Sequence, residues 1–233
     1  MFVSLTIVRY PVIFIPFALL AMAIFRLPLL INKDISFYKL MGSGKNGTFD
    51  KIPDLQQWAL LATHKNNKSL ILYGRFITGW WKFFQCEIFT IYLEPREGHG
   101  MWDGREVFGK LNEDPIRDEP VATLTRATIR MSKLKYFWKH VAPVAQHMNI
   151  AKGFIFSAGI GEVPWIKQAT FSIWQNKEDM KEFAYQMKEH KEVIRKTRQQ
   201  KWYSEEMFVR FCIIKSTGSL RGNDPLSKLK FQK

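Results

Sequence analysis

Hydrophobic and polar residues recur in a regular order through the C-terminal half of the chain. Residues 121–131 have the β-branched content of a strand. The apolar positions that follow, within residues 133–148, fall on one face of a helix. They are Leu134, Phe137, Trp138, Val141, Val144, Ala145 and Met148. The pattern therefore predicts a strand followed by an amphipathic helix.

The remaining segments of this half complete a β-α-β-β-α-β order. Residues 153–161 and 168–174 are predicted to form a strand pair, and residues 207–215 a last strand. Between them, residues 177–199 predict a long charged helix. This order of elements is that of a ferredoxin-like unit.

The N-terminal half repeats the same series. The matching segments are 37–42 and 154–159, 58–63 and 169–174, and 87–93 and 206–214. Internal repetition on this scale indicates a tandem duplication. Through the repeat, the N-terminal half is predicted to contain strands at 2–8, 35–41, 57–63 and 87–93, and helices at 11–30 and 67–84.

The duplication predicts the organisation of the whole chain. Residues 94–120 are rich in Gly, Pro and Asp and are predicted to be a linker with a partly ordered loop. We expect an N-terminal ferredoxin-like half at 1–105, a linker at 106–120 and a C-terminal half at 121–233. Two such units in one chain form an α+β fold of the dimeric α/β-barrel type, which holds ligands between sheet and helices.

Residues 11–31 are almost continuously apolar and long enough to cross a bilayer. A signal peptide would need a basic region before this segment, and only Arg9 precedes it. A membrane span would contain Pro16, Arg26 and Pro28. The repeat favours a third alternative, an unusually apolar helix that packs on a sheet and touches the membrane surface.

The composition narrows the class of partner. A net charge of +14 predicts an acidic partner: nucleic acid, an anionic membrane or an acidic protein. Aromatic residues make up 15% of the chain, which favours a large apolar pocket, and no nucleic-acid-binding motif is present, so we expect no nucleic acid partner. Cys86 and Cys212 form no Cys-x-x-Cys pair, which excludes a zinc knuckle and a c-type haem and favours a reduced, cytoplasmic compartment.

Two residue types suggest chemistry. His190 lies three residues after Met187 and four before Ile194, which places it on the flank of the apolar stripe of the predicted helix 177–199. Two interpretations remain open for it: a boundary residue of the helix, or a metal or haem ligand. Arg126 and Arg130 share one face of the strand at 121–131. An inward arginine needs an anion beside it, so the pattern alone favours an outward orientation for both.

Several motifs resemble the spheroidene monooxygenase family of carotenoid biosynthesis. They are residues 124–130 (LTRATIR), 159–165 (GIGEVPW) and 170–174 (TFSIW). The similarity continues in the C-terminal half through His190, Ile194, Arg195, Trp202, residues 205–211 and residues 224–226. In the first half it covers residues 37–44. The resemblance spans nearly the whole chain and is weakest in the N-terminal helix.

The resemblance implies an oxygen-dependent monooxygenase that contains haem b. Such an enzyme hydroxylates C-2 of an acyclic carotenoid end group. A second hydroxylation at the same carbon gives a geminal diol, which loses water to become a 2-ketone. The implied partners are a carotenoid substrate, a ferredoxin-like electron donor and the surface of the inner membrane, to which a cytoplasmic enzyme would be peripheral.

The resemblance also implies site residues. Haem proteins with similar duplicated folds, such as aldoxime dehydratases, bind iron through a helix histidine in the C-terminal half, which fits His190. Arg126 is expected to be a catalytic or haem-binding group on the distal side or at a propionate, and Trp165 a catalytic residue of the pocket wall. The alternatives are a haem aldoxime dehydratase-like enzyme and a non-catalytic haem- or carotenoid-binding protein.

Overall fold

The computed structural model describes residues 1–45, 51–65, 72–109, 111, 119–186, 195–197, 199–227 and 229. The chain divides into two compact units. Unit 1 comprises Met1–Ser43, Pro53–Glu94 and Ile213–Lys233, and unit 2 comprises Gly44–Ile52 and Pro95–Cys212.

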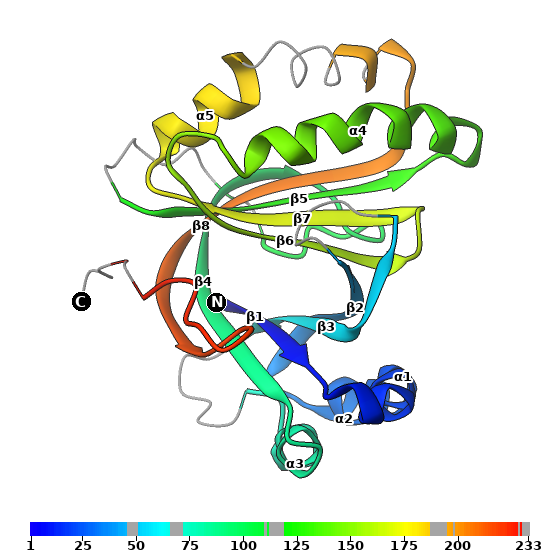
Figure 1. The fold of residues 1–233 in the computed structure, drawn as a ribbon, viewed down its shortest axis with the longest axis vertical. Helices are drawn as coiled ribbons and strands as arrows, with labels where there is room; N and C mark the ends of the chain where they lie inside the picture. The colour runs from blue at the N-terminus through cyan, green and yellow to red at the C-terminus, as the bar shows by residue number, and fades with distance from the viewer. Residues whose placement is uncertain are drawn as a thin grey trace. The chain divides into compact units, whose positions relative to one another are not determined.

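Unit 1 is a sheet with helices on one face. Its central strand, β1 (Phe2–Arg9), pairs antiparallel with β3 (Pro53–His64) and with β4 (Glu87–Gly100). Strand β2 (Ile35–Gly44) lies next to β3. The helical segments are η1 (Val12–Phe14), α1 (Ile15–Ile24), α2 (Arg26–Ile31) and α3 (Arg75–Phe83), and Figure 1 shows α1, α2 and α3 on the same side of this sheet.

The apolar segment after β1 packs on the sheet, as predicted. Ala18, Ala21, Phe25 and Leu29 are buried in one cluster with sheet residues such as Leu60. The single helix expected over 11–30 is instead broken between α1 and α2, because Pro28 has no N–H to donate to residue 24 and its ring crowds that carbonyl. By length and composition, Val12–Ile31 also suffices to cross a membrane, although 22% of it is buried.

The second helix of unit 1 begins later than predicted. Gly74 has a φ of 85°, a conformation that ends the preceding turn and that side chains rarely adopt. Helix α3 therefore starts at Arg75, and of the range predicted before it, residues 67–71 lie outside the described part of the chain.

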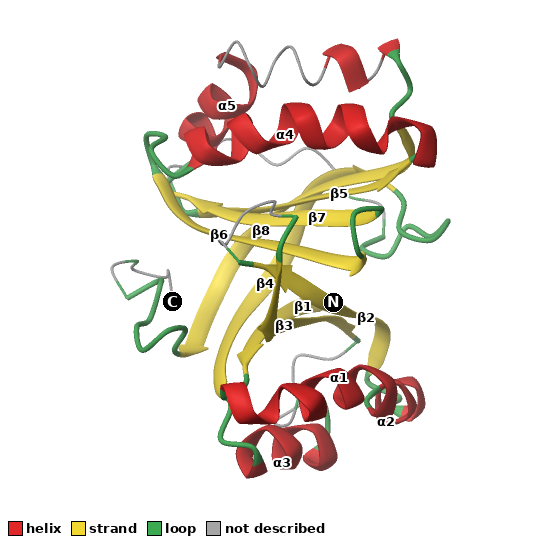
Figure 2. Ribbon diagram, turned by 45° about the vertical axis from the view of Figure 1, so that its right-hand side comes forward, coloured by secondary structure: helices red, strands yellow, loops and turns green. Residues whose placement is uncertain are grey.

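Unit 2 repeats the arrangement. Strand β5 (Val121–Ile129) pairs antiparallel with β7 (Lys167–Trp174) and with β8 (Tyr203–Gly218), and β6 (Phe154–Val163) pairs with β7. The helical segments η2 (Met131–Lys133), α4 (Leu134–Met148) and α5 (Lys177–Gln186) cover one face of this sheet (Figure 2).

Both units therefore have the predicted β-α-β-β-α-β order. The two sheets follow the same sequence of strands, β4-β1-β3-β2 in unit 1 and β8-β5-β7-β6 in unit 2. The predicted α+β fold of tandem ferredoxin-like repeats, of the dimeric α/β-barrel type, is confirmed.

The prediction that a linker starts at residue 94 is wrong. Strand β4 continues to Gly100, and β8 is also longer than predicted. The glycine-rich composition indicated a loop, but Gly98 and Gly100 lie within strand β4. A Cβ on Gly98 would overlap the backbone carbonyl of Phe208 on β8, and a Cβ on Gly100 would overlap that of Glu206. Glycine permits this close backbone approach.

A network of buried polar groups lies under the helices of unit 1. Ser4 Oγ is 2.7 Å from His64 Nε2, and Tyr73 Oη donates to Ser4 Oγ at 2.9 Å. Thr6 Oγ1 lies 2.8 Å from both Tyr73 Oη and Thr90 Oγ1. His64 is fully buried, and burial lowers its pKa to about 4, against a smaller opposing effect of Asp34.

We predict that the buried His64 lowers the free energy of unfolding of unit 1 as the pH falls. Between pH 6.5 and about 4 the unfolded histidine binds a proton and the folded one does not, so stability rises with pH through this range. The contribution is on the order of 3 kcal/mol. Urea unfolding just above pH 6.5 and near pH 4 should show a smaller loss in His64→Gln than in the wild type. Equal losses in the two proteins would contradict this assignment, and His140→Gln serves as the control.

Candidate functional site

The candidate site is the helix-facing side of the unit 2 sheet. Val121 at the start of β5 packs with Met180 and Phe183 of α5, which fixes the face of the strand that looks toward the helices. Because side chains alternate along a strand, Thr123 and Thr125 lie on this same face. The opposite face carries Arg126.

Four polar residues form one cross-strand row on the helix-facing side. Thr123 on β5 is paired with Arg210 on β8 and with Ser172 on β7, and Ser172 is paired with Ser157 on β6. Thr123 Oγ1 lies 2.8 Å from Ser172 Oγ, which also accepts a hydrogen bond of 3.0 Å from Trp174 Nε1. The three hydroxyl residues are buried, and burying hydroxyls is costly unless they find partners.

The next row is only partly covered. Thr170 is buried, and its hydroxyl has no hydrogen-bond partner among the described residues. Its cross-strand neighbour Thr125 is exposed, although β5 has a paired strand on each side. The row of polar residues on the helix-facing side, here called the polar floor, is therefore exposed at Thr125, and beside Thr125 the Thr170 hydroxyl has no partner among the described residues.

Arg210 gives this floor a positive charge. Its Nη2 donates to Glu97, which also accepts from Lys177 Nζ at 2.9 Å. Its Nε has no hydrogen-bond partner among the described residues, and burial lowers the pKa of the guanidinium. Sequence reasoning missed Arg210 as a site residue, although it lies in the 205–211 stretch that carries the family resemblance.

Arg126 is buried on the other face of the same sheet, with 1% of its surface exposed. Its Nη1 pairs with Glu205, and its Nη2 lies 3.6 Å from carboxylate oxygens of Asp103 and Glu162. The outward orientation favoured by the sequence is therefore wrong for Arg126, because these carboxylates offset the cost of burying the cation. Arg130, by contrast, is exposed as expected.

Glu205 is held in its ionised form. Burial alone would raise its pKa, but hydrogen bonds from the Gly104 N–H, from Arg126 and from the Asp103 N–H outweigh burial and lower it. The stabilising effect is thus present above the ordinary pKa of a glutamate and is lost as the pH falls below it.

Trp165 lies in the turn between β6 and β7. Its φ is 64°, and 54% of its surface is exposed. The indole Nε1 donates to the Lys51 carbonyl at 3.4 Å, and the Trp165 carbonyl accepts from Trp138 Nε1 of α4 at 3.2 Å. The described contacts do not join Trp165 to Arg126.

His190 lies outside the described residues, so its role as iron ligand stays a prediction. Another histidine of unit 2, His140 on α4, is already engaged: its Nδ1 is 2.8 Å from the Tyr136 carbonyl and its Nε2 is 3.3 Å from Lys196 Nζ. Within the described part of the chain, no group of three or more His, Cys, Asp or Glu residues is arranged to hold a metal ion.

The chain is similar over most of its length to three curated proteins. It is 33% identical to the spheroidene monooxygenase of Rhodobacter capsulatus over 220 residues, which covers 91% of this chain and 90% of the relative. The chain belongs to the spheroidene monooxygenase family. The chain is also similar to two further spheroidene monooxygenases. It is 33% identical to that of Cereibacter sphaeroides, over 82% of this chain and 60% of the relative, and 29% identical to that of Rubrivivax gelatinosus, over 84% of this chain and 75% of the relative. The prediction of an oxygen-dependent oxidoreductase is confirmed.

Solved structures support the fold of this family member. The chain is similar to an aldoxime dehydratase, with a TM-score of 0.60 and 9% identity, over 91% of this chain and 80% of that chain. It is also similar to the aldoxime dehydratase OxdRE in complex with butyraldoxime, with a TM-score of 0.58 and 11% identity, over 91% of this chain and 79% of that chain. At this level of identity the similarity concerns the fold alone. No family model matches the chain.

We predict that Arg126→Gln lowers the free energy of unfolding by about 1.5 to 3 kcal/mol, because it leaves three partly exposed carboxylates without the buried cation that they contact. Arg130→Gln, at the exposed residue directly after β5, should change it by less than about 0.5 kcal/mol. Urea unfolding at neutral pH measures both. Similar values for the two variants would show that the Arg126 ion pairs contribute nothing specific.

Proposed function

We propose that this protein is a haem-dependent monooxygenase that hydroxylates C-2 of an acyclic carotenoid end group, with a second hydroxylation at C-2 that leads to a 2-ketone. The observation that carries the proposal is the identity of 33% to a spheroidene monooxygenase along 90% of that relative. The name of that relative supplies the carotenoid as substrate class.

The reaction defines what the protein must supply. Each hydroxylation inserts one atom of dioxygen into a C–H bond, and two electrons and two protons reduce the other atom to water. We propose an acidic, ferredoxin-like protein as electron donor, because complementary charge on this basic chain would speed its association. The second hydroxylation gives a geminal diol, which loses water to form the ketone.

The helix-facing side of the unit 2 sheet fits a haem in its polar chemistry. Arg210 carries an N–H without a described partner, which suits a propionate, and the unsatisfied Thr170 hydroxyl lies on the same face near the exposed Thr125. When bound, haem supplies the activation of dioxygen at its iron. We propose His190 as the iron ligand and Arg210 as a propionate partner.

Arg126 and Trp165 keep proposed roles away from the helix-facing side, on the opposite face of the unit 2 sheet and at the β6–β7 turn. Three carboxylates already surround Arg126, so its Nε, which has no partner among the described residues, suits a polar end of the substrate better than an anionic group of the cofactor. Trp165 exposes its ring at the β6–β7 turn, which suits contact with an apolar substrate.

We further propose that unit 1 docks on an anionic membrane, as a cytoplasmic enzyme peripheral to the inner membrane. Its helical segments expose large apolar side chains, here called the apolar helix surface: Val12, Ile13, Phe17, Leu19, Leu20, Leu27, Leu30, Ile31, Phe76 and Phe83. Exposed Arg26, Lys33, Arg75 and Lys82 lie on or beside the same segments. Apolar side chains flanked by cations favour binding to an anionic lipid interface, where a carotenoid is dissolved.

The function is tested with the purified protein, a carotenoid such as spheroidene, labelled dioxygen and a reducing system. We expect a haem absorption band and a product that carries one labelled oxygen atom at C-2. His190→Ala should abolish haem retention and oxygenation, whereas His140→Ala and His147→Ala should leave both intact. A His190 variant with full haem content and activity would refute the ligand assignment, and an unchanged carotenoid in the wild type would refute the oxygenase.

Membrane docking is tested by co-sedimentation with vesicles. The double variant Leu30→Glu and Phe83→Glu should bind phosphatidylglycerol vesicles at least tenfold more weakly, because burying each side chain in the interface contributes about 1.5 to 3 kcal/mol. Ile150→Glu, which replaces an equally exposed apolar residue of unit 2, should bind like the wild type. Equal loss in both proteins would refute docking through the apolar helix surface.

A further inference from the structure

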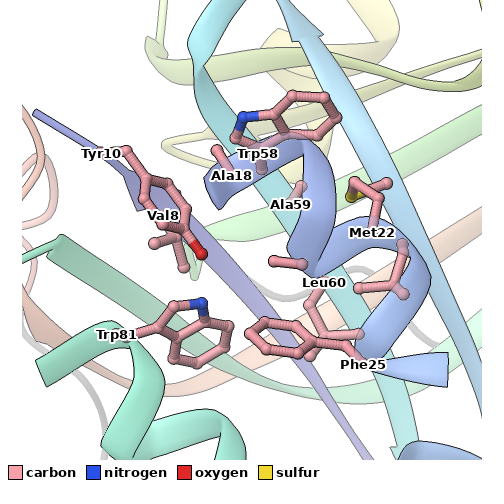
Figure 3. A pocket seen from close by; sticks show the side chains of 11 residues that line it. Val8, Tyr10, Ala18, Met22, Phe25, Trp58, Ala59, Leu60 and Trp81 are labelled. Atoms are coloured by element: carbon pink, nitrogen blue, oxygen red, sulfur yellow. The ribbon is translucent and has the colours of Figure 1, made fainter. Parts of the chain in front are cut away.

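The hollow between α1 and the sheet of unit 1 belongs to the packing of that unit. Tyr10, Trp58, Phe25 and Trp81 are among the residues that border it (Figure 3), and its volume is about 20 Å³. That is room for about one water molecule and not for a ligand. The surface of unit 2, where charge is unevenly distributed, offers more room for a further partner.

Positive charge is concentrated at one end of the helix layer of unit 2. The sequence contains no Asp or Glu at residues 120–161 or 193–204. The next carboxylates, Glu205 and Glu206, follow on β8, and Glu205 is paired with Arg126 on the other face of the sheet. Seven cations at this end, five of them exposed and two half-buried, are here called the basic surface. They are Arg130, Lys133, Lys135, Lys139, Arg195, Lys196 and Lys201.

Contacts between α4 and the segment before β8 hold the basic surface together. Lys196 Nζ lies 3.3 Å from His140 Nε2, and the ring of His140 lies 5.4 Å from that of Trp202. The Arg130 N–H donates to the Trp202 carbonyl at 2.9 Å, and Arg130 Nε donates to the Tyr203 carbonyl at 3.2 Å. Two segments that are far apart in the sequence therefore present their cations together.

A packed aromatic cluster lies beneath these cations. Trp202 is fully buried and packs with Ile129, Phe137 and Trp138. The rings of Phe137 and Trp138 meet edge to face at 5.3 Å. Because this core fixes the backbone from which the cations project, a partner that binds them has less freedom to remove from the protein.

The described carboxylates of the helix layer lie at the other end of α4. Glu178, Asp179 and Glu182 belong to α5, whose Met180 packs with Met148 at the last residue of α4. Helix α4 has 15 residues and is roughly 22 Å long, more than two Debye lengths at physiological ionic strength. These carboxylates therefore do little to offset the charge of the basic surface.

The side chains of the basic surface suit an acidic protein better than a membrane. Its exposed large apolar side chains are Met131 and Tyr136, and Lys133 Nζ lies 5.7 Å from the centroid of the Tyr136 ring. Met, Tyr and Arg are enriched in protein–protein interfaces. A surface that enters a bilayer needs many large apolar side chains, such as those of the apolar helix surface.

We propose that the basic surface docks an acidic protein that carries one electron at a time. This inference rests on the proposed function, in which each hydroxylation consumes two electrons. A one-electron carrier must therefore bind and leave twice for each hydroxylation, which requires rapid association and dissociation. Exposed charges of opposite sign raise the association rate more than the affinity, and redox complexes accordingly have small interfaces.

Docking is tested by titrating the full-length purified protein with an oxidised, acidic [2Fe–2S] ferredoxin, with basic cytochrome c as the control probe. We expect saturable binding of the ferredoxin, weakened about tenfold or more between roughly 20 and 200 mM salt, because salt screens exposed charges. Cytochrome c should show no saturable binding. Absence of ferredoxin binding at the lower salt concentration, or binding that salt does not weaken, would overturn the proposal.

Charge reversal then assigns the binding to the basic surface. The double variant Lys135→Glu and Lys139→Glu, at exposed positions one turn apart on α4, should weaken ferredoxin binding about tenfold or more. The double variant Lys65→Glu and Lys215→Glu, at exposed lysines of unit 1, makes the same change in net charge and should bind within about twofold of the wild type. Equal weakening in both would mean that net charge alone drives binding and would overturn the docking site.

Two further variants exclude an effect through misfolding. Lys135→Arg with Lys139→Arg keeps both charges and should keep ferredoxin binding. Lys135→Gln with Lys139→Gln removes the charges without reversing them and should weaken binding in the same direction but less. All these variants should keep the midpoint of thermal unfolding of the wild type, since the positions are exposed. Unchanged binding in the folded Gln variant would contradict the docking site.

The same variants distinguish other anionic partners. Phosphatidylglycerol vesicles or duplex DNA that bind more tightly than the ferredoxin, and lose binding in Lys135→Glu with Lys139→Glu, would overturn the proposal. The titrations need neither haem, carotenoid nor dioxygen. Failed oxygenation with intact ferredoxin binding would therefore refute the proposed function alone, and oxygenation with a chemical reductant but no ferredoxin binding would refute the docking alone.

Discussion

Burial of both faces of each sheet is the constraint on which the rest of this structure depends. Seven of the eight residues of β1 are buried, and the central strand β5 is buried at most positions. A polar side chain on such a strand cannot reach water, so it must find a partner inside the protein or remain unsatisfied at a cost. The functional interest of the molecule therefore lies in how each buried polar group is satisfied.

The buried polar groups divide into those with partners and those without. Ser4, Thr6 and Tyr73 hydrogen-bond one another, whereas His64 contacts Ser4 through Nε2 and its Nδ1 has no partner among the described residues. Arg126 is paired with carboxylates, yet its Nε has no partner among the described residues, and neither has the Nε of Arg210 or the Thr170 hydroxyl. These unsatisfied groups therefore lie on both faces of the unit 2 sheet.

The fold was largely predictable from the sequence, and the site was not. Alternation and helical spacing predicted the strands and helices because these patterns are local. The internal repeat then predicted the elements of the N-terminal half, where the local pattern is weaker. The end of β4 was missed because Gly98 and Gly100 have the composition of a loop, while their role depends on a distant strand. The orientation of Arg126 likewise depends on Asp103, Glu162 and Glu205, which no local pattern connects to it. His190 drew attention first through its helical spacing and then through the family resemblance, whereas Arg210 drew attention only once its surroundings were known.

The break at Phe25 limits how deeply unit 1 can enter a bilayer. Helix α1 has 10 residues, and at a rise of 1.5 Å per residue it is about 15 Å long, roughly half the thickness of a hydrocarbon core. In the proposed docking, with α1 and α2 both lying along the sheet, the segment would reach only the nearer leaflet. An enzyme docked in this way would leave the membrane without unfolding and would take up its hydrocarbon only from the leaflet that it contacts.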